Sequence, residues 1–148
     1  MSLAISTEFG YCVIVAVAMA IQCKARVMDV EAFRERYNMP HPESDGGQPE
    51  GQLSDEDRAR FNRIKHLRDS CHEHLITALP LFLLAALFYP RLTINQGVMY
   101  MLAHAAYNWF YTRGKLEACK YCMLFIKVKT LMWAVLAMHG AAMVTIFA

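Results

Sequence analysis

Residues 130–148 read TLMWAVLAMHGAAMVTIFA. This run contains no Lys, Arg, Asp or Glu, and His139 is its one ionisable side chain. A helix of a soluble bundle would carry a polar stripe with a period of about 3.6 residues, and almost no such stripe is present here. A hydrocarbon core about 30 Å thick requires roughly 20 helical residues. We therefore expect this segment to span a membrane.

Three further runs lack charged residues: Gly10–Gln22, Leu75–Tyr89 and Leu92–Thr112. The third is long enough to cross a bilayer, and the first two reach that length through the mixed residues beside them. The sequence predicts an all-α fold, a four-helix transmembrane bundle that forms one integral membrane domain over residues 1–148. The expected helices cover about 6–34, 54–89, 92–113 and 117–148, with Asn95 in a tight turn into the third. A loop rich in Pro and Gly covers about 38–53.

Composition supports this interpretation. Apolar residues make up 56% of the 148 residues and charged residues 19%, whereas soluble proteins average about 45–50% and 25%. The excess argues against a soluble multidomain enzyme and against a disordered chain. The net charge is only +2, so no nucleic-acid partner is expected. The expected partner is the lipid bilayer.

Basic residues are distributed unequally between the connections. The segment Cys23–Arg68 contains nine, the third connection and its flanks contain five, and the opposite side contains only Arg91. Positively charged connections remain on the cytoplasmic side or its equivalent. The long loop and the third connection are therefore expected on that side, with both termini across the membrane. An endoplasmic reticulum or a mitochondrial membrane fits this topology.

Polar side chains gather where the helices meet the cationic side. Spacings of three or four residues place polar side chains on one face of each helix. On the second helix these are His66, Ser70, Glu73 and His74, and on the third helix they are His104, Tyr107 and Tyr111. Polar groups near membrane depth are costly and usually functional. Arg34 can pair with a carboxylate and Glu73 can receive an ammonium group. We expect a polar cavity for an anionic, peptide-like ligand.

Plainer interpretations stay open. Arginines and tyrosines at this level also serve as ordinary interfacial anchors. His72 and His74 lie two residues apart and point to different sides of a helix, so no metal site is expected. Cys119 and Cys122 have the CxxC spacing, but no thioredoxin-like pattern surrounds them, so we do not expect a redox role.

The layout resembles the MAPEG family, the membrane-associated proteins in eicosanoid and glutathione metabolism, and among them most closely the microsomal glutathione transferases of the third type. The resemblance rests on the helix count, the long first connection, Glu73 and several short segments. These segments are Glu8-Phe9-Gly10, Phe33-Arg34-Glu35-Arg36-Tyr37, Phe61-Asn62-Arg63-Ile64, Tyr89-Pro90-Arg91-Leu92 and Tyr107 to Gly114.

The resemblance implies a homotrimer that holds glutathione between protomers near the positive face and activates its thiol as a thiolate. The thiolate then attacks a lipophilic electrophile or reduces a lipid hydroperoxide. It implies binding by Arg34 and Glu73, with Tyr107 and Tyr111 nearby. We assign catalytic roles to Tyr107 and Lys120, and co-substrate binding to the remaining residues of the polar set: Arg34, His66, Ser70, Glu73, His74, His104 and Tyr111.

Several positions depart from the family pattern. The family's Arg-x-x-x-Asn-x-x-Glu reads here as His66, Ser70 and Glu73, and His104 replaces an arginine. Ala118 occupies the place of a thiol-activating arginine, for which Lys115 or Lys120 could substitute. An active glutathione-dependent transferase or peroxidase is therefore one hypothesis. The alternatives are a catalytically degenerate accessory subunit of a larger membrane complex and a lipid- or ligand-binding protein without turnover.

Overall fold

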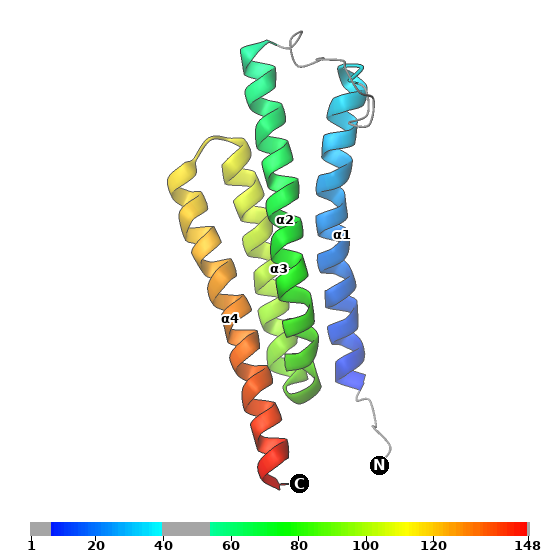
Figure 1. Ribbon diagram of the computed structural model, residues 1–148, viewed down its shortest axis with the longest axis vertical. Coiled ribbons are helices and arrows are strands. Elements are labelled where there is room, and N and C mark those ends of the chain that lie inside the picture. Colours follow the sequence, from blue (N-terminus) through cyan, green and yellow to red (C-terminus); the bar gives the residue numbers. More distant parts are fainter. Residues whose placement is uncertain (1–6, 40–53, 148) are drawn as a thin grey trace.

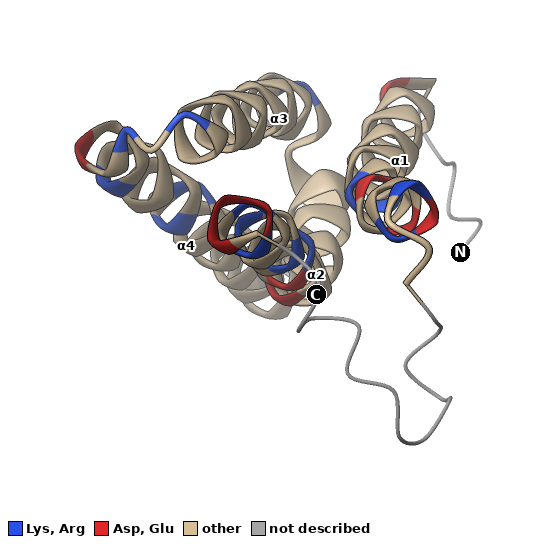
Figure 2. Ribbon diagram, turned by 90° about the horizontal axis from the view of Figure 1, so that it is seen from above, with Lys and Arg blue, Asp and Glu red and all other residues tan. Residues whose placement is uncertain are grey.

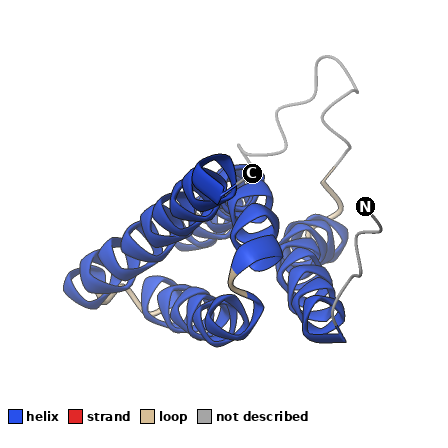
Figure 3. Cartoon of the chain, turned by 90° about the horizontal axis from the view of Figure 1, so that it is seen from below, coloured by secondary structure: helices blue, strands red, loops and turns tan. Residues whose placement is uncertain are grey.

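The computed structural model describes residues 7–39 and 54–147, and this part of the chain is helical apart from short turns (Figure 3). Four helices follow one another within these described residues. They are α1 (Thr7–Arg36), α2 (Asp55–Phe88), α3 (Pro90–Thr112) and α4 (Leu116–Phe147). The expected all-α fold is confirmed.

Local chemistry explains where α2 begins. The backbone N–H of Asp57 donates to Oγ of Ser54 over 3.2 Å, so one of the unpaired N–H groups at the helix start is satisfied. Asp55, Glu56 and Asp57 occupy the first turn, where negative charge is favoured by the helix dipole. A serine directly before acidic residues is a typical start of a helix, and the structure has this N-cap.

Only Tyr89 separates α2 from α3. Pro90 occupies the first turn of α3, a position that suits proline because its fixed φ is helical and no N–H is needed there. The expected turn at Asn95 is therefore wrong, since Asn95 lies one turn inside α3. At the other end of α3, Gly114 adopts a φ of +71°, which allows the reversal into α4.

The helices pack around α2. Helix α2 contacts each of the other three, while α1 also contacts α3, and α3 contacts α4 (Figures 1 and 2). An aromatic group fixes the centre: the fully buried rings of Phe82 and Trp133 meet edge to face with centroids 5.1 Å apart, and Tyr100 lies 5.1 Å from Trp133. Gly97 gives α3 a close approach to Phe82 and to Val15 of α1.

The last turns of α1 and the first turns of α2 extend beyond the α3–α4 connection (Figure 1). Val30 and Phe33 pack there against Phe61 in a small separate core. Tyr37 stacks on Phe33 and donates a hydrogen bond of 2.7 Å to Oδ1 of Asp57. This hydrogen bond to a carboxylate raises the pKa of Tyr37 above its ordinary value. It also joins the end of α1 to the start of α2.

Three helices, α1, α2 and α4, are long and apolar enough to span a membrane. Only 22%, 28% and 17% of their most apolar windows are buried inside the chain, so most of that apolar surface requires lipid or another subunit as its neighbour. The sequence predicts four spans, but α3 has no stretch of membrane-spanning length that is as apolar as those of the other three helices. The reason is that α3 turns its polar residues toward the bundle interior, where they are buried: Thr93, Gln96, His104 and Asn108.

Candidate functional site

A connected group of side chains lies between α2 and α3 at the end with the two basic connections. The rings of His66 and Tyr111 are 5.3 Å apart, and Tyr111 stacks on Tyr107 at 5.6 Å. The side chain of Tyr107 lies beside that of Ser70, and both residues are buried. The structure thus brings together four of the predicted site residues.

A second pair lies one turn deeper in the bundle. The rings of His74 and His104 are 5.5 Å apart, and His104 lies 4.6 Å from Tyr100. Among the described residues, Nδ1 of His74, Nε2 of His104 and the hydroxyl of Tyr100 are buried without a hydrogen-bond partner. Buried polar groups usually have partners, so this layer is suited to hold water or another polar molecule.

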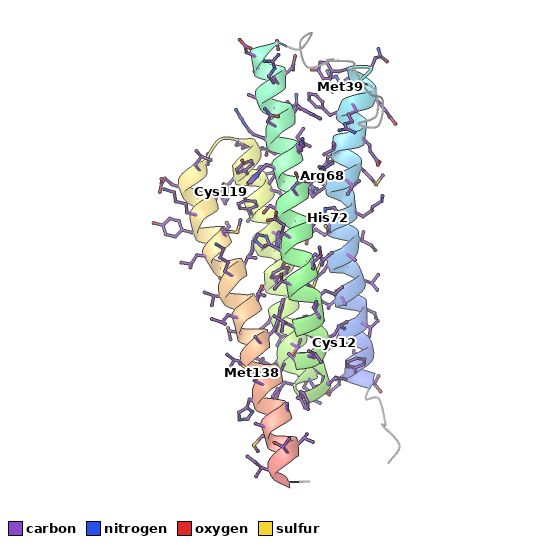
Figure 4. The ribbon with its side chains drawn as sticks, in the orientation of Figure 1. Cys12, Met39, Arg68, His72, Cys119 and Met138 are labelled. Atoms are coloured by element: carbon purple, nitrogen blue, oxygen red, sulfur yellow. The ribbon has the colours of Figure 1, made fainter. Side chains whose placement is uncertain are left out.

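A groove between α3 and α4 contains both residues that we assign to catalysis. It has a volume of about 490 Å³ and is lined by Tyr107, Leu116, Cys119, Lys120, Met123, Leu124 and Lys127. Figure 4 labels Cys119, one of these lining residues, near the top of α4. Nζ of Lys120 pairs with Glu117 over 2.7 Å, and both side chains are exposed. Tyr107 belongs to this groove and also to the group between α2 and α3.

Sequence reasoning missed Lys127 as a member of this groove. Lys127 follows Lys120 by seven residues, so both lie on one face of α4. That spacing is a signal that could have identified it. Cys119 and Met123 carry no comparable signal, because buried Cys and Met are ordinary packing residues.

Arg34 and Glu73 lie apart from these groups within the single chain. The guanidinium carbon of Arg34 lies 5.9 Å from the ring centroid of Phe61, and Arg34 borders a cavity of about 600 Å³ at the end of α1. Glu73 is exposed on the outer face of α2. Among the described residues, no hydrogen bond, ion pair or ring contact joins either side chain to the His66–Tyr111 group, so the single chain does not gather the whole predicted set in one place.

No group of three or more His, Cys, Asp or Glu side chains within residues 7–39 and 54–147 is placed to hold a metal ion. Cys23 of α1 and Cys71 of α2 contact each other in the core. All five cysteines are free thiols.

The family model of the MAPEG family matches residues 9–142. The matched range begins in the first turn of α1 and ends inside α4, so it includes parts of all four helices and all the site residues described above. No curated protein matches the chain.

Proposed function

Because this chain belongs to the MAPEG family, we propose that it is a glutathione-dependent transferase or peroxidase that acts on lipophilic electrophiles or lipid hydroperoxides at a membrane. Membership supports a membrane role in glutathione or eicosanoid metabolism in general. The observation that carries the specific proposal is the groove between α3 and α4, where Tyr107, Lys120 and Lys127 border an otherwise largely apolar lining.

The groove supplies what thiol chemistry requires. A thiolate is the reactive nucleophile, and nearby positive charge lowers the pKa of a thiol. In this proposal the ammonium groups of Lys120 and Lys127 favour the thiolate of glutathione, and the hydroxyl of Tyr107 donates a hydrogen bond to the sulfur. Leu116, Met123 and Leu124 give the acyl part of a lipophilic substrate an apolar surface.

Atoms and electrons balance in both proposed reactions without a further reactant. In transfer, the sulfur forms a bond to an electrophilic carbon, and the electron pair of the broken bond leaves with the displaced atom. In peroxide reduction, two molecules of glutathione give one disulfide, and the hydroperoxide gives an alcohol and water. Glutathione is therefore a co-substrate in both reactions.

Binding of glutathione is assigned to the polar set near the positive end. Arg34 offers a planar fork for a carboxylate, and Glu73 offers an acceptor for the α-ammonium group. His66, Ser70 and Tyr111 are assigned hydrogen bonds along the peptide, and His74 and His104 complete the polar layer behind them. Because Arg34 and Glu73 lie apart in one chain, we propose a homotrimer in which neighbouring protomers complete each site.

The test is glutathione binding by the protein purified in lipid nanodiscs, followed by titration calorimetry. Arg34→Ala and Glu73→Gln should each weaken binding at least ten-fold, or about 1.4 kcal/mol. Glu8→Gln is the matched control, because Glu8 pairs with Arg91 at the opposite end of the bundle. Tyr107→Phe should lower the turnover number while leaving affinity within about two-fold. Unchanged affinity in both Arg34→Ala and Glu73→Gln would reject this site.

A second candidate function is an accessory subunit of a larger membrane complex that has lost catalysis. One observation favours it: His104, which stands where the family pattern has an arginine, is 3% exposed and packed against Tyr100. The guanidinium group that an arginine at position 104 would offer to a ligand is therefore absent. Stoichiometric co-purification of other membrane subunits, together with no heat on addition of millimolar glutathione, would select this alternative.

A further inference from the structure

A cleft opens between α1 and α2, away from the groove that we assign to catalysis. It has a volume of about 620 Å³, and Thr112 at the end of α3 borders it. Four arginines line it, together with three acidic and four apolar residues: Arg26, Arg36, Arg60 and Arg63; Asp29, Glu56 and Asp57; and Ala32, Phe33, Ile64 and Leu67. Figure 2 shows the basic residues on these ends of α1 and α2, seen from above.

Two of the three acidic side chains in the cleft have partners, although Asp57 keeps its negative charge and interacts with Arg60 and Arg36. Asp29 forms an ion pair of 2.8 Å with Nη1 of Arg26. Asp57 accepts hydrogen bonds from the hydroxyls of Tyr37 and Ser54. Of the three acidic residues, Glu56 alone has no such partner among the described residues.

The lining has four arginines against three carboxylates, which leaves an excess of one positive charge. Within the described ranges, Arg36, Arg60 and Arg63 form no ion pair with a carboxylate. Nε of Arg26 is buried and has no hydrogen-bond partner there. A buried donor without an acceptor is destabilising. The cleft therefore has guanidinium groups without an ion-pair partner among the described residues, and Arg26 has a buried N–H that no described acceptor meets.

The position of the cleft indicates which class of anion it could bind. Arg26 follows the charge-free run Gly10–Gln22 by four residues, so it lies where α1 leaves the hydrocarbon. Phe33, Ile64 and Leu67 give the same cleft an apolar wall. Basic pockets between helices at this level suit the headgroups of anionic lipids, and guanidinium groups bind phosphate through paired hydrogen bonds.

We propose that the α1–α2 cleft binds the phosphate ester of an anionic phospholipid, with Arg60, Arg63 and Arg26 on the phosphate oxygens. The apolar wall takes the first carbons of the acyl chains. This site does not depend on glutathione chemistry, because it lies on the α1–α2 side of the bundle and shares no lining residue with the α3–α4 groove.

The experiment uses the full chain in nanodiscs of phosphatidylcholine that contain a minor fraction of phosphatidylglycerol. After mild extraction, native mass spectrometry measures which lipid remains bound. Wild-type protein should retain phosphatidylglycerol in preference to phosphatidylcholine, and Arg60→Gln/Arg63→Gln should reduce that preference at least ten-fold. The matched control is Lys24→Gln/Lys65→Gln, which removes the same charge from exposed positions on the same two helices outside the cleft lining. The control should retain the wild-type preference.

Two further measurements distinguish a phospholipid headgroup from other anions that could occupy the cleft. Inorganic phosphate, titrated at millimolar concentration into nanodiscs of pure phosphatidylcholine, should give no saturable heat, and saturable binding there would assign the cleft to free phosphate and overturn the lipid assignment. Glutathione affinity should be the same in Arg60→Gln/Arg63→Gln as in wild type. Loss of glutathione binding, or equal loss of lipid preference in the control, would also overturn the proposal.

Discussion

Replacement of Gly97 by alanine tests the packing that holds α1, α2 and α3 together. A Cβ atom at this position would lie 2.6 Å from Cε2 of Phe82 and 2.7 Å from Cγ1 of Val15, whereas carbon atoms in contact are normally about 3.5–4.0 Å apart. Phe82 is fully buried against Trp133 and cannot move aside freely. Overpacking of this kind costs about 1–3 kcal/mol.

A second substitution separates packing from helix propensity. Alanine stabilises a helix over glycine by about 0.8–1.0 kcal/mol, and this gain partly offsets the clash at Gly97. Gly10→Ala carries the same propensity gain, but no atom lies within 4 Å of its Cβ. The free energy of unfolding should therefore be lower in Gly97→Ala than in Gly10→Ala by about 1–3 kcal/mol.

The assay is equilibrium unfolding in mixed micelles, with dodecyl sulfate as the denaturant and helix content followed by circular dichroism. Equal stability of the two variants would refute the close approach of α3 to both neighbours. A Gly97→Ala variant more stable than Gly10→Ala would refute it more strongly.

Three further predictions use the same purified protein. Trp133→Ala should lower the free energy of unfolding by about 3–5 kcal/mol, because the indole is fully buried, and a loss below 1 kcal/mol would contradict its central position. The hydrogen bond to Asp57 raises the pKa of Tyr37 in the fold above the ordinary tyrosine value of about 10. The stabilisation is therefore fully present below a pH of about 10 and is lost between that value and the raised pKa. In this window the stability of wild type should fall more steeply with pH than that of Tyr37→Phe. Lys120→Gln should reduce the fraction of bound glutathione present as thiolate at neutral pH roughly ten-fold, the effect of one pKa unit, while Lys129→Gln, which lies outside the groove lining, should leave it unchanged.

The sequence predicts the local features of the fold well because they depend on neighbouring residues. Ser54 caps α2, as its position before three acidic residues indicates. The placement of Asn95 in a turn fails for a similar local reason, since Pro90 can begin a helix at once. The lack of an apolar stretch of membrane-spanning length in α3 has a tertiary cause, because its buried polar residues face the other three helices instead of lipid.

The candidate site shows where spacing stops being informative. Ser70 and Glu73 are three residues apart, so they differ by about 60° around the helix axis. At the border of an interface this difference is enough to bury Ser70 and leave Glu73 exposed. Residue spacing also assigns Tyr107 to one face of α3 and Lys120 to one face of α4, but it does not show that these two faces meet. Their meeting in one groove depends on how α3 and α4 dock, which no single-helix pattern contains.

The central claim is that the cationic end of this MAPEG bundle binds glutathione and stabilises its thiolate. The most direct measurement is an ultraviolet difference spectrum of wild-type protein in nanodiscs during a glutathione titration at neutral pH. We predict a thiolate absorbance that rises with added glutathione and saturates at a fixed ratio of glutathione to protein. This absorbance should be smaller in Lys120→Gln than in wild type. A spectrum without a thiolate band up to millimolar glutathione would contradict the claim.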